Sequence, residues 1–80
     1  MPTVSLGREF GQVLSRFRRD AGLSQEKLAF SCGFHPTYVS QLERGVKTPT
    51  LGTIFLLGRA LGVPPSELVR KVEQLLASAG

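Results

Sequence analysis

The sequence of 80 residues has little of what disulfide-bonded, metal-binding or membrane-spanning proteins need. It contains no tryptophan and a single cysteine, Cys32, which excludes a disulfide within the chain. Cys32 and the lone His35 are too few side chains for a metal site of the usual ligand number, so we expect neither metal nor cofactor. No apolar run approaches the roughly 20 residues that a membrane helix requires, and the first residues lack the pattern of a secretory signal. These absences favour a cytoplasmic location.

The sequence also lacks the residue combinations on which enzymes depend. It has no glycine-rich phosphate loop, no nucleophile at a suitable spacing from a base, and no carboxylate pair that suggests a cleft. We therefore expect no enzymatic activity and no small-molecule substrate.

The sequence does have an excess of positive charge on a chain of ordinary hydrophobicity. Lysine and arginine total 10 against 6 aspartates and glutamates, which gives a formal net charge of +4. The hydrophobic fraction of 41% is typical of a folded protein, and residues 1–80 are expected to form one domain. A basic balance favours a polyanionic partner such as nucleic acid.

Apolar residues recur at helical spacing in five segments, and no segment alternates as a strand would. Each segment begins with a side chain that can cap a helix or with a proline that suits a first turn. The expected starts are Ser5, Ser24, His35 or Pro36, Thr50 and Pro65. Glycines favour helix ends because they adopt positive φ readily. The expected stops are Gly22, Gly33, Gly45 and Gly62.

Residues 24–45 carry the most informative pattern of the chain. Two short helical segments are joined by a tight turn at Gly33, with apolar residues inside each helix and small polar or basic residues outside the second. This pattern predicts a helix-turn-helix, whose second helix can lie in the major groove of DNA.

Several short blocks, in order and spacing, resemble the phage-repressor and Cro-like helix-turn-helix family. The blocks are Arg18, Gly22–Gln25, Leu28–Ala29, Gly33, Tyr38–Gly45, Pro49–Thr50 and Ala60–Val63. The resemblance covers about residues 6–76 and implies an all-α, five-helix, lambda-repressor-like DNA-binding domain with a central helix-turn-helix. Within the family, His35–Ser40 most resembles the controller proteins of restriction–modification systems.

The resemblance implies that the helix beginning near Pro36 reads bases through Thr37, Ser40 and Gln41. Gln41 can donate and accept at once, which suits an adenine edge, and the Thr37 methyl can meet a thymine methyl. Pro36 departs from the long polar residue often found at its position in the family, so we expect only an apolar contact there. The alternative is that Gln41 is merely a solvated helix residue.

Residues at the rim should contact phosphates, which fixes register without reading sequence. The resemblance implies such a contact for Gln25, and Tyr38, Arg44 and Lys47 are candidates on the other side, with the two cations carrying the salt dependence. His35 is a further candidate for DNA contact. The alternatives are that Tyr38 packs its ring on the helix edge and that His35 only caps the helix.

The family pattern also pairs an arginine of the first helix with the glutamate that ends the recognition helix. Arg18 and Glu43 occupy those positions, so the resemblance implies a partly buried, charge-assisted contact. Removing one partner would leave an uncompensated charge. We therefore expect Arg18 to hold the fold together rather than to bind phosphate.

One short helix reads too few base pairs to discriminate well, so we expect a homodimer on two half-sites of a pseudo-palindromic operator, about 34–36 Å apart. The sequence has more apolar residues near its C-terminus than one small core needs, which indicates an interface. The expected interface residues are Phe55, Leu56, Val69, Val72, Leu75 and Leu76. The alternative is that they complete the monomer core. Phe30 should project outward from the second helix.

The sequence thus predicts a sequence-specific, double-stranded DNA-binding transcriptional regulator, which leaves a repressor, an activator and a dual controller as alternatives. Its length leaves no room for a separate ligand-sensing domain. The alternative function is an antitoxin or another protein-binding module on the same fold, for which the surplus apolar residues would serve equally well.

Overall fold

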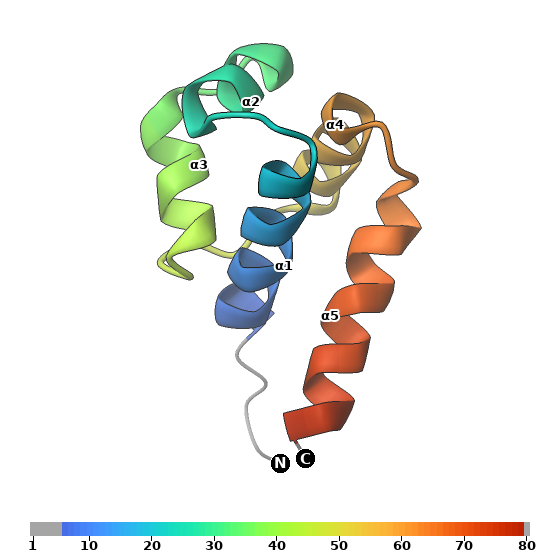
Figure 1. The fold of residues 1–80 in the computed structure, drawn as a ribbon. Helices are drawn as coiled ribbons and strands as arrows, with labels where there is room; N and C mark the ends of the chain where they lie inside the picture. The colour runs from blue at the N-terminus through green and yellow to red at the C-terminus, as the bar shows by residue number, and fades with distance from the viewer. Residues whose placement is uncertain (1–5, 80) are drawn as a thin grey trace.

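The computed structural model describes residues 6–79, which form five α-helices and no strand (Figure 1). The helices are α1 Leu6–Asp20, α2 Gln25–Cys32, α3 Pro36–Glu43, α4 Leu51–Leu61 and α5 Pro65–Ala79. The expected all-α, five-helix fold is confirmed, whereas the N-cap expected at Ser5 lies outside the described residues. In that described range, none of the helices is long and apolar enough to cross a membrane.

Local signals set the helix ends around the turn from α2 to α3 and at the start of α4. Ser24 Oγ accepts from the backbone N–H of Lys27 at 3.0 Å, and Thr50 Oγ1 accepts from that of Thr53 at 3.1 Å. Gly33 ends α2 with a φ of +74°, in the left-handed region that glycine adopts without strain. The chain therefore reverses compactly into α3.

The core is built from one apolar face of each helix. Its fully buried side chains are Leu14, Leu28, Val39, Leu42, Leu57 and Leu68. Figure 1 shows α1 in the middle, with α3 on one side and α5 on the other, and both pack against it. The helix that should read DNA is therefore held by α1 and α2 and stands away from α5.

The contact between α1 and α3 depends on a glycine that the sequence analysis did not single out. A Cβ at Gly11 would stand 2.5 Å from the Glu43 carbonyl oxygen and 2.6 Å from that of Leu42. No side chain fits at that separation, so Gly11 lets the two helix backbones meet directly.

The structure corrects part of the expected interface on α5. Val72 is only 8% exposed and belongs to the core of the single chain, so it offers little surface to a second copy. Leu75 and Leu76 are half-buried against the same core, and Leu75 lies in a groove beside α1. Helical periodicity places Val72, Leu75 and Leu76 together on the apolar side of α5. How deeply each of them is buried depends instead on how α5 packs on α1.

Candidate nucleic-acid interface

α3 turns one face to the core and the other outward. Val39 and Leu42 are fully buried and fix the orientation of the helix. The outward positions are Pro36 and Thr37, which are exposed, and Ser40 and Gln41, which are half-buried. The structure therefore brings together the four residues that the sequence assigned to the recognition surface.

A shallow depression runs between the start of α2 and the outward face of α3. Its lining residues are Arg18, Ser24, Gln25, Glu26, Pro36, Thr37 and Ser40. Four of these side chains carry a hydroxyl or an amide, which can donate and accept hydrogen bonds. The depression thus places Gln25, which we expect to contact a phosphate, next to the residues that we expect to contact bases.

His35 caps α3, which is the role that the sequence left open as an alternative to DNA contact. Its Nδ1 accepts from the backbone N–H of Thr37 at 3.1 Å, while the Tyr38 N–H donates to the His35 carbonyl oxygen at 3.0 Å. Because Nδ1 accepts, the neutral imidazole carries its hydrogen on Nε2. The exposed ring therefore caps the helix with one nitrogen and offers a donor with the other.

Arg18 and Glu43 form a bidentate ion pair between α1 and α3. Arg18 Nε lies 2.6 Å from Glu43 Oε2, and its second terminal nitrogen lies 3.1 Å from Oε1. The remaining terminal nitrogen donates to the Leu23 carbonyl oxygen at 2.8 Å. Gln25 Nε2 also donates to Glu43 Oε1, at 3.1 Å. Glu43 therefore gathers α1, α2 and α3 at one point.

The burial of this pair decides its role. The side chains of Arg18 and Glu43 are 13% and 7% exposed, so water screens their attraction only weakly. The hydrogen bond to Glu43, together with its charge, raises the pKa of Arg18 against the opposing effect of burial. Arg18 is thus permanently charged, and each of its three guanidinium nitrogens donates to a group inside the protein.

Tyr38 links α3 to the start of α4. Its ring packs edge-on against Phe34, with ring centroids 5.0 Å apart. Its hydroxyl lies 3.1 Å from Oγ1 of Thr53, which also accepts from Oγ1 of Thr50 at 3.1 Å. Thr53 is buried, and sequence reasoning missed it because a threonine inside an apolar helix pattern gives no sign of what it faces.

Three cations lie near the C-terminal end of α3. Arg44 is exposed and donates from Nε to Ser40 Oγ at 3.3 Å, and Lys47 is exposed in the loop that follows. Sequence reasoning missed Arg8, whose Cα would stand 2.9 Å from a Cβ built on Gly45. The signal for Arg8 is tertiary, since it is the packing of α1 on this loop that brings Arg8 beside the end of α3.

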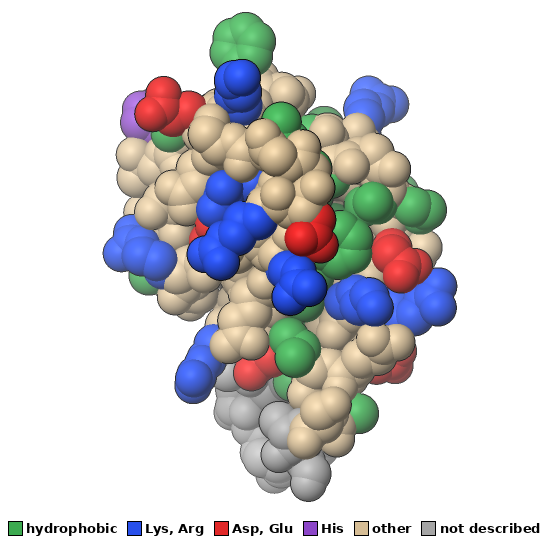
Figure 2. Space-filling model, viewed as in Figure 1, with side chains coloured by type: hydrophobic (Ala, Val, Ile, Leu, Met, Phe, Trp, Pro, Cys, Tyr) green, Lys and Arg blue, Asp and Glu red, His purple; other side chains and the backbone are tan. Residues whose placement is uncertain are grey.

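Figure 2 shows cationic side chains in a band across the face on which α1 lies between α3 and α5. Acidic side chains are fewer but lie among these cations, and Asp20 and Glu67 pair with Arg16 and Arg70. Cations therefore extend beyond the recognition helix, onto the face formed by α1 and α5.

An apolar surface lies on α4 and α5. Leu51, Phe55 and Val69 line one shallow depression, and Phe55 is 58% exposed. Leu51, in the first turn of α4, is 69% exposed. Leu56 is also exposed, but it lines a separate depression with Phe55 and Arg59.

Cys32 and Phe30 lie in the last turn of α2. Cys32 is half-buried, with Sγ 3.6 Å from the Leu56 carbonyl oxygen, and burial raises the pKa of its thiol. This geometry is that of a packed thiol that is slow to form the reactive thiolate. Phe30 is 88% exposed at the end of α2, as the sequence indicated.

Two short helices joined at Gly33, the second packed by one face and polar on the other, define a helix-turn-helix domain. The helix-turn-helix family model matches residues 14–68, more than half of the chain. The chain therefore belongs to the helix-turn-helix family.

Individual relatives narrow the comparison. Control protein C.BamHI from Bacillus amyloliquefaciens is 44% identical over 61 residues, which cover 75% of each chain. The crystal structure of the restriction-modification controller protein C.AhdI from Aeromonas hydrophila is 44% identical, with a TM-score of 0.74 over 79% of this chain and 94% of that chain.

A third comparison extends over nearly the whole fold. The crystal structure of the clp gene regulator ClgR from Corynebacterium glutamicum matches with a TM-score of 0.89 at 28% identity, covering 98% of this chain and 83% of that chain. The predicted resemblance to helix-turn-helix regulators, and within them to controller proteins, is confirmed.

Proposed function

We propose that this DNA-binding transcriptional regulator acts as a homodimer that recognises a pseudo-palindromic operator through α3. The observation that carries the proposal is the orientation of α3. Val39 and Leu42 are fully buried, so Thr37, Ser40 and Gln41 have to lie on the side that a duplex can reach. This is the arrangement with which a recognition helix enters the major groove.

Base reading is assigned to the outward residues of α3. Gln41 is assigned hydrogen bonds to the edge of an adenine, since its amide can donate and accept in one plane. Thr37 and Ser40 offer hydroxyls, and Thr37 adds a methyl group for thymine. Pro36 has no N–H and a nonpolar ring, so it contributes an apolar contact and no hydrogen bond.

Phosphate binding is assigned to groups whose orientation the fold already fixes. Gln25 Nε2 uses one hydrogen on Glu43 and keeps the other for a phosphate oxygen. His35 keeps its Nε2–H free because Nδ1 caps the helix. Such donors set the register of the protein on the duplex without reading its sequence.

The remaining phosphate contacts are assigned to the other end of the helix and its flank. Arg44 and Lys47 supply charge, which releases counterions from DNA. Thr53 Oγ1 receives a hydrogen bond from Thr50, so its own hydrogen can go to the Tyr38 oxygen. That arrangement leaves the Tyr38 hydroxyl hydrogen for a phosphate.

Dimerisation is assigned to the apolar surface of Leu51, Phe55 and Val69, with Leu56 at its margin. Exposed apolar groups that adjoin one another on a small protein usually mark an interface. A two-fold interface would place a second α3 on the same duplex, one helical turn away. This function places the protein in the cytoplasm.

The test is selection of bound sequences from random duplex DNA, followed by mobility-shift titration with unlabelled competitor. The proposal predicts two inverted half-sites about one DNA turn apart and binding that survives random competitor. Binding that never exceeds the level on random DNA would overturn it and favour a protein-binding module.

A further inference from the structure

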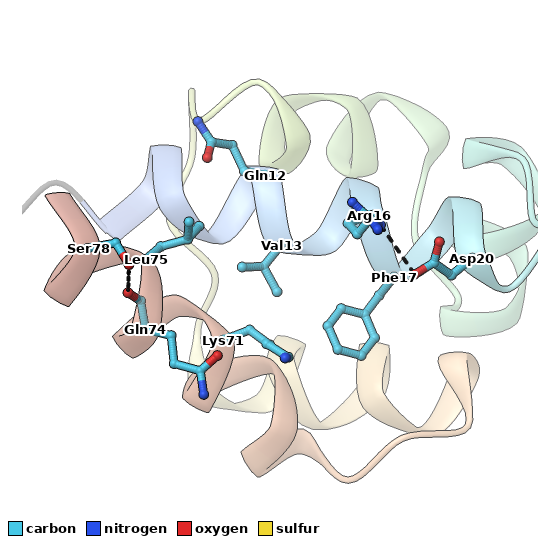
Figure 3. Close-up of a pocket in the computed structure, with 9 residues that line it drawn as sticks. All are labelled: Gln12, Val13, Arg16, Phe17, Asp20, Lys71, Gln74, Leu75 and Ser78. Carbon is cyan, nitrogen blue, oxygen red and sulfur yellow. Dashed lines mark hydrogen bonds and ion pairs between the residues drawn. The ribbon is translucent and has the colours of Figure 1, made fainter.

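A groove between α1 and α5 is not used by the proposed function. Its volume is about 580 Å³, within the range of sites that accept ligands or side chains of a partner. Figure 3 shows its floor, formed by Val13, Phe17 and Leu75. Phe17 and Leu75 are only partly buried, so the floor has apolar surface left to cover.

The rim of the groove carries one cation on each side, together with the carboxylate of Asp20 on the α1 side. Arg16 projects from α1 and Lys71 from α5, and Figure 3 shows the Lys71 side chain extending over the groove toward Phe17. Arg16 pairs with Asp20 at 3.4 Å, but both side chains are mostly exposed, so this pair is weak. Among the ion pairs of residues 6–79, none includes Lys71.

Uncharged hydrogen-bonding groups complete the rim. Gln12 stands on the α1 side and Gln74 on the α5 side, both exposed. The band of cations in Figure 2 crosses this same face. An occupant that matches the groove has aliphatic side chains in the middle and carboxylates along its edges.

The groove faces away from both surfaces that the proposed function occupies. At about 100° per residue, Val13 lies about 160° around α1 from Gly11, which contacts α3. On the same basis, Lys71 and Gln74 lie about 160° and 140° around α5 from Val69. A dimer bound to DNA would leave the groove open.

We propose that the α1–α5 groove docks an acidic amphipathic helix of another protein. The occupant's aliphatic stripe covers Val13, Phe17 and Leu75, and its carboxylates meet Arg16 and Lys71. This is the helix-in-groove mode of recognition, with charge complementarity at the rim. The apolar floor argues against a nucleic acid, whose backbone offers nothing to cover it. The proposal rests on the proposed function only in assuming that DNA and the second copy bind elsewhere.

The experiment titrates the isotope-labelled protein with two synthetic helical peptides and follows its amide NMR signals. Both peptides carry the same leucine stripe, and one has glutamate where the other has lysine. The acidic peptide should shift the signals of Gln12, Arg16, Lys71 and Gln74, and the lysine peptide should not. Added salt should weaken the binding, because the rim charges are exposed.

Charge reversal supplies the matched variants. Lys71→Glu should lower the affinity for the acidic peptide about tenfold, equivalent to about 1.4 kcal/mol. Lys27→Glu, which reverses an exposed lysine on α2 outside the groove, should leave the affinity unchanged. The melting temperature of each variant checks that the fold is kept.

Four outcomes would overturn the proposal. The first two are that the acidic peptide does not bind and that both peptides bind equally well. The third is that the shifts are confined to α3 or to the Leu51–Phe55–Val69 surface. The fourth is that the groove signals move when duplex DNA is added, or when only the protein concentration changes. Specific DNA binding is measured separately on Lys71→Glu. Loss of peptide binding with DNA binding intact isolates the groove, and the absence of specific DNA binding in every variant rejects the proposed function instead.

Discussion

Arg18 holds both carboxylate oxygens of Glu43, at 2.6 and 3.1 Å, and so fixes the end of the recognition helix against α1. The same carboxylate accepts from Gln25 at the start of α2. Since charge-assisted, bidentate contacts are directional, this arrangement limits how far α3 can rotate or slide. The two helices of the helix-turn-helix are thus locked to each other through α1 as well as through the turn.

Removing one member of this pair should cost stability. Arg18→Ala leaves Glu43 buried without its cation, and we expect a loss of about 3 kcal/mol in the free energy of unfolding. Chemical denaturation measures it. Arg16→Ala, which breaks the exposed pair with Asp20, should cost less than about 1 kcal/mol and serves as the control. Equal losses in the two variants would show that the buried pair has no special role.

Gly11 and Gly52 should respond oppositely to alanine. At Gly11 the new methyl would meet backbone oxygens at 2.5 and 2.6 Å, so Gly11→Ala should destabilise the protein by about 2 kcal/mol or more. At Gly52 the nearest atom, Thr50 Oγ1, is 3.8 Å away, so Gly52→Ala should stabilise α4 by about 0.5–1 kcal/mol. Melting temperatures that move in the same direction would contradict this account of the α1–α3 contact.

The apolar surface on α4 and α5 should control association. Phe55→Glu places a charge where the second copy is to pack, and we expect the protein to become monomeric at micromolar concentration. Sedimentation velocity measures the change. Phe30→Glu alters another exposed phenylalanine, on α2, and should leave the dimer intact. A dimer that persists in Phe55→Glu would show that the interface lies elsewhere on the protein.

Cys32 should titrate late and react slowly. Burial raises the pKa of the thiol because the low-dielectric surroundings disfavour the thiolate. The folded protein therefore holds this proton more tightly than the unfolded chain, so its stability should fall as pH rises from the unfolded towards the folded value. The ultraviolet absorbance of the thiolate, followed against pH, should show a midpoint above that of the unfolded chain. A midpoint at or below it would mean that the thiol is exposed.

The sequence predicted the helices well because their ends depend on local chemistry. Ser24 and Thr50 cap their helices through their own side chains, and Gly33 makes the turn by its own φ. Such signals are complete within a few residues. The same holds for the outward face of α3, which follows from the burial of Val39 and Leu42 on the opposite side.

What the sequence missed depends on how the helices cross. Gly52 and Gly58 look alike in the sequence, yet a Cβ at Gly58 would stand 2.9 Å from the Val63 carbonyl oxygen, whereas one at Gly52 would have its nearest contact, Thr50 Oγ1, at 3.8 Å. Val69 and Val72 belong to one stripe of α5, but Val69 is 48% exposed and Val72 only 8%. Periodicity identifies an apolar face, whereas the neighbour that covers each residue is set by tertiary packing.

The central claim is that the outward face of α3 distinguishes base sequences, and paired affinity measurements test it most directly. Wild type, Gln41→Ala and Lys47→Ala are each titrated against the selected duplex and a scrambled duplex at fixed salt. We expect Gln41→Ala to lose about 1–3 kcal/mol on the selected duplex alone, and Lys47→Ala to weaken both duplexes alike. The contradicting result is a Gln41→Ala variant that discriminates between the two duplexes as well as wild type does.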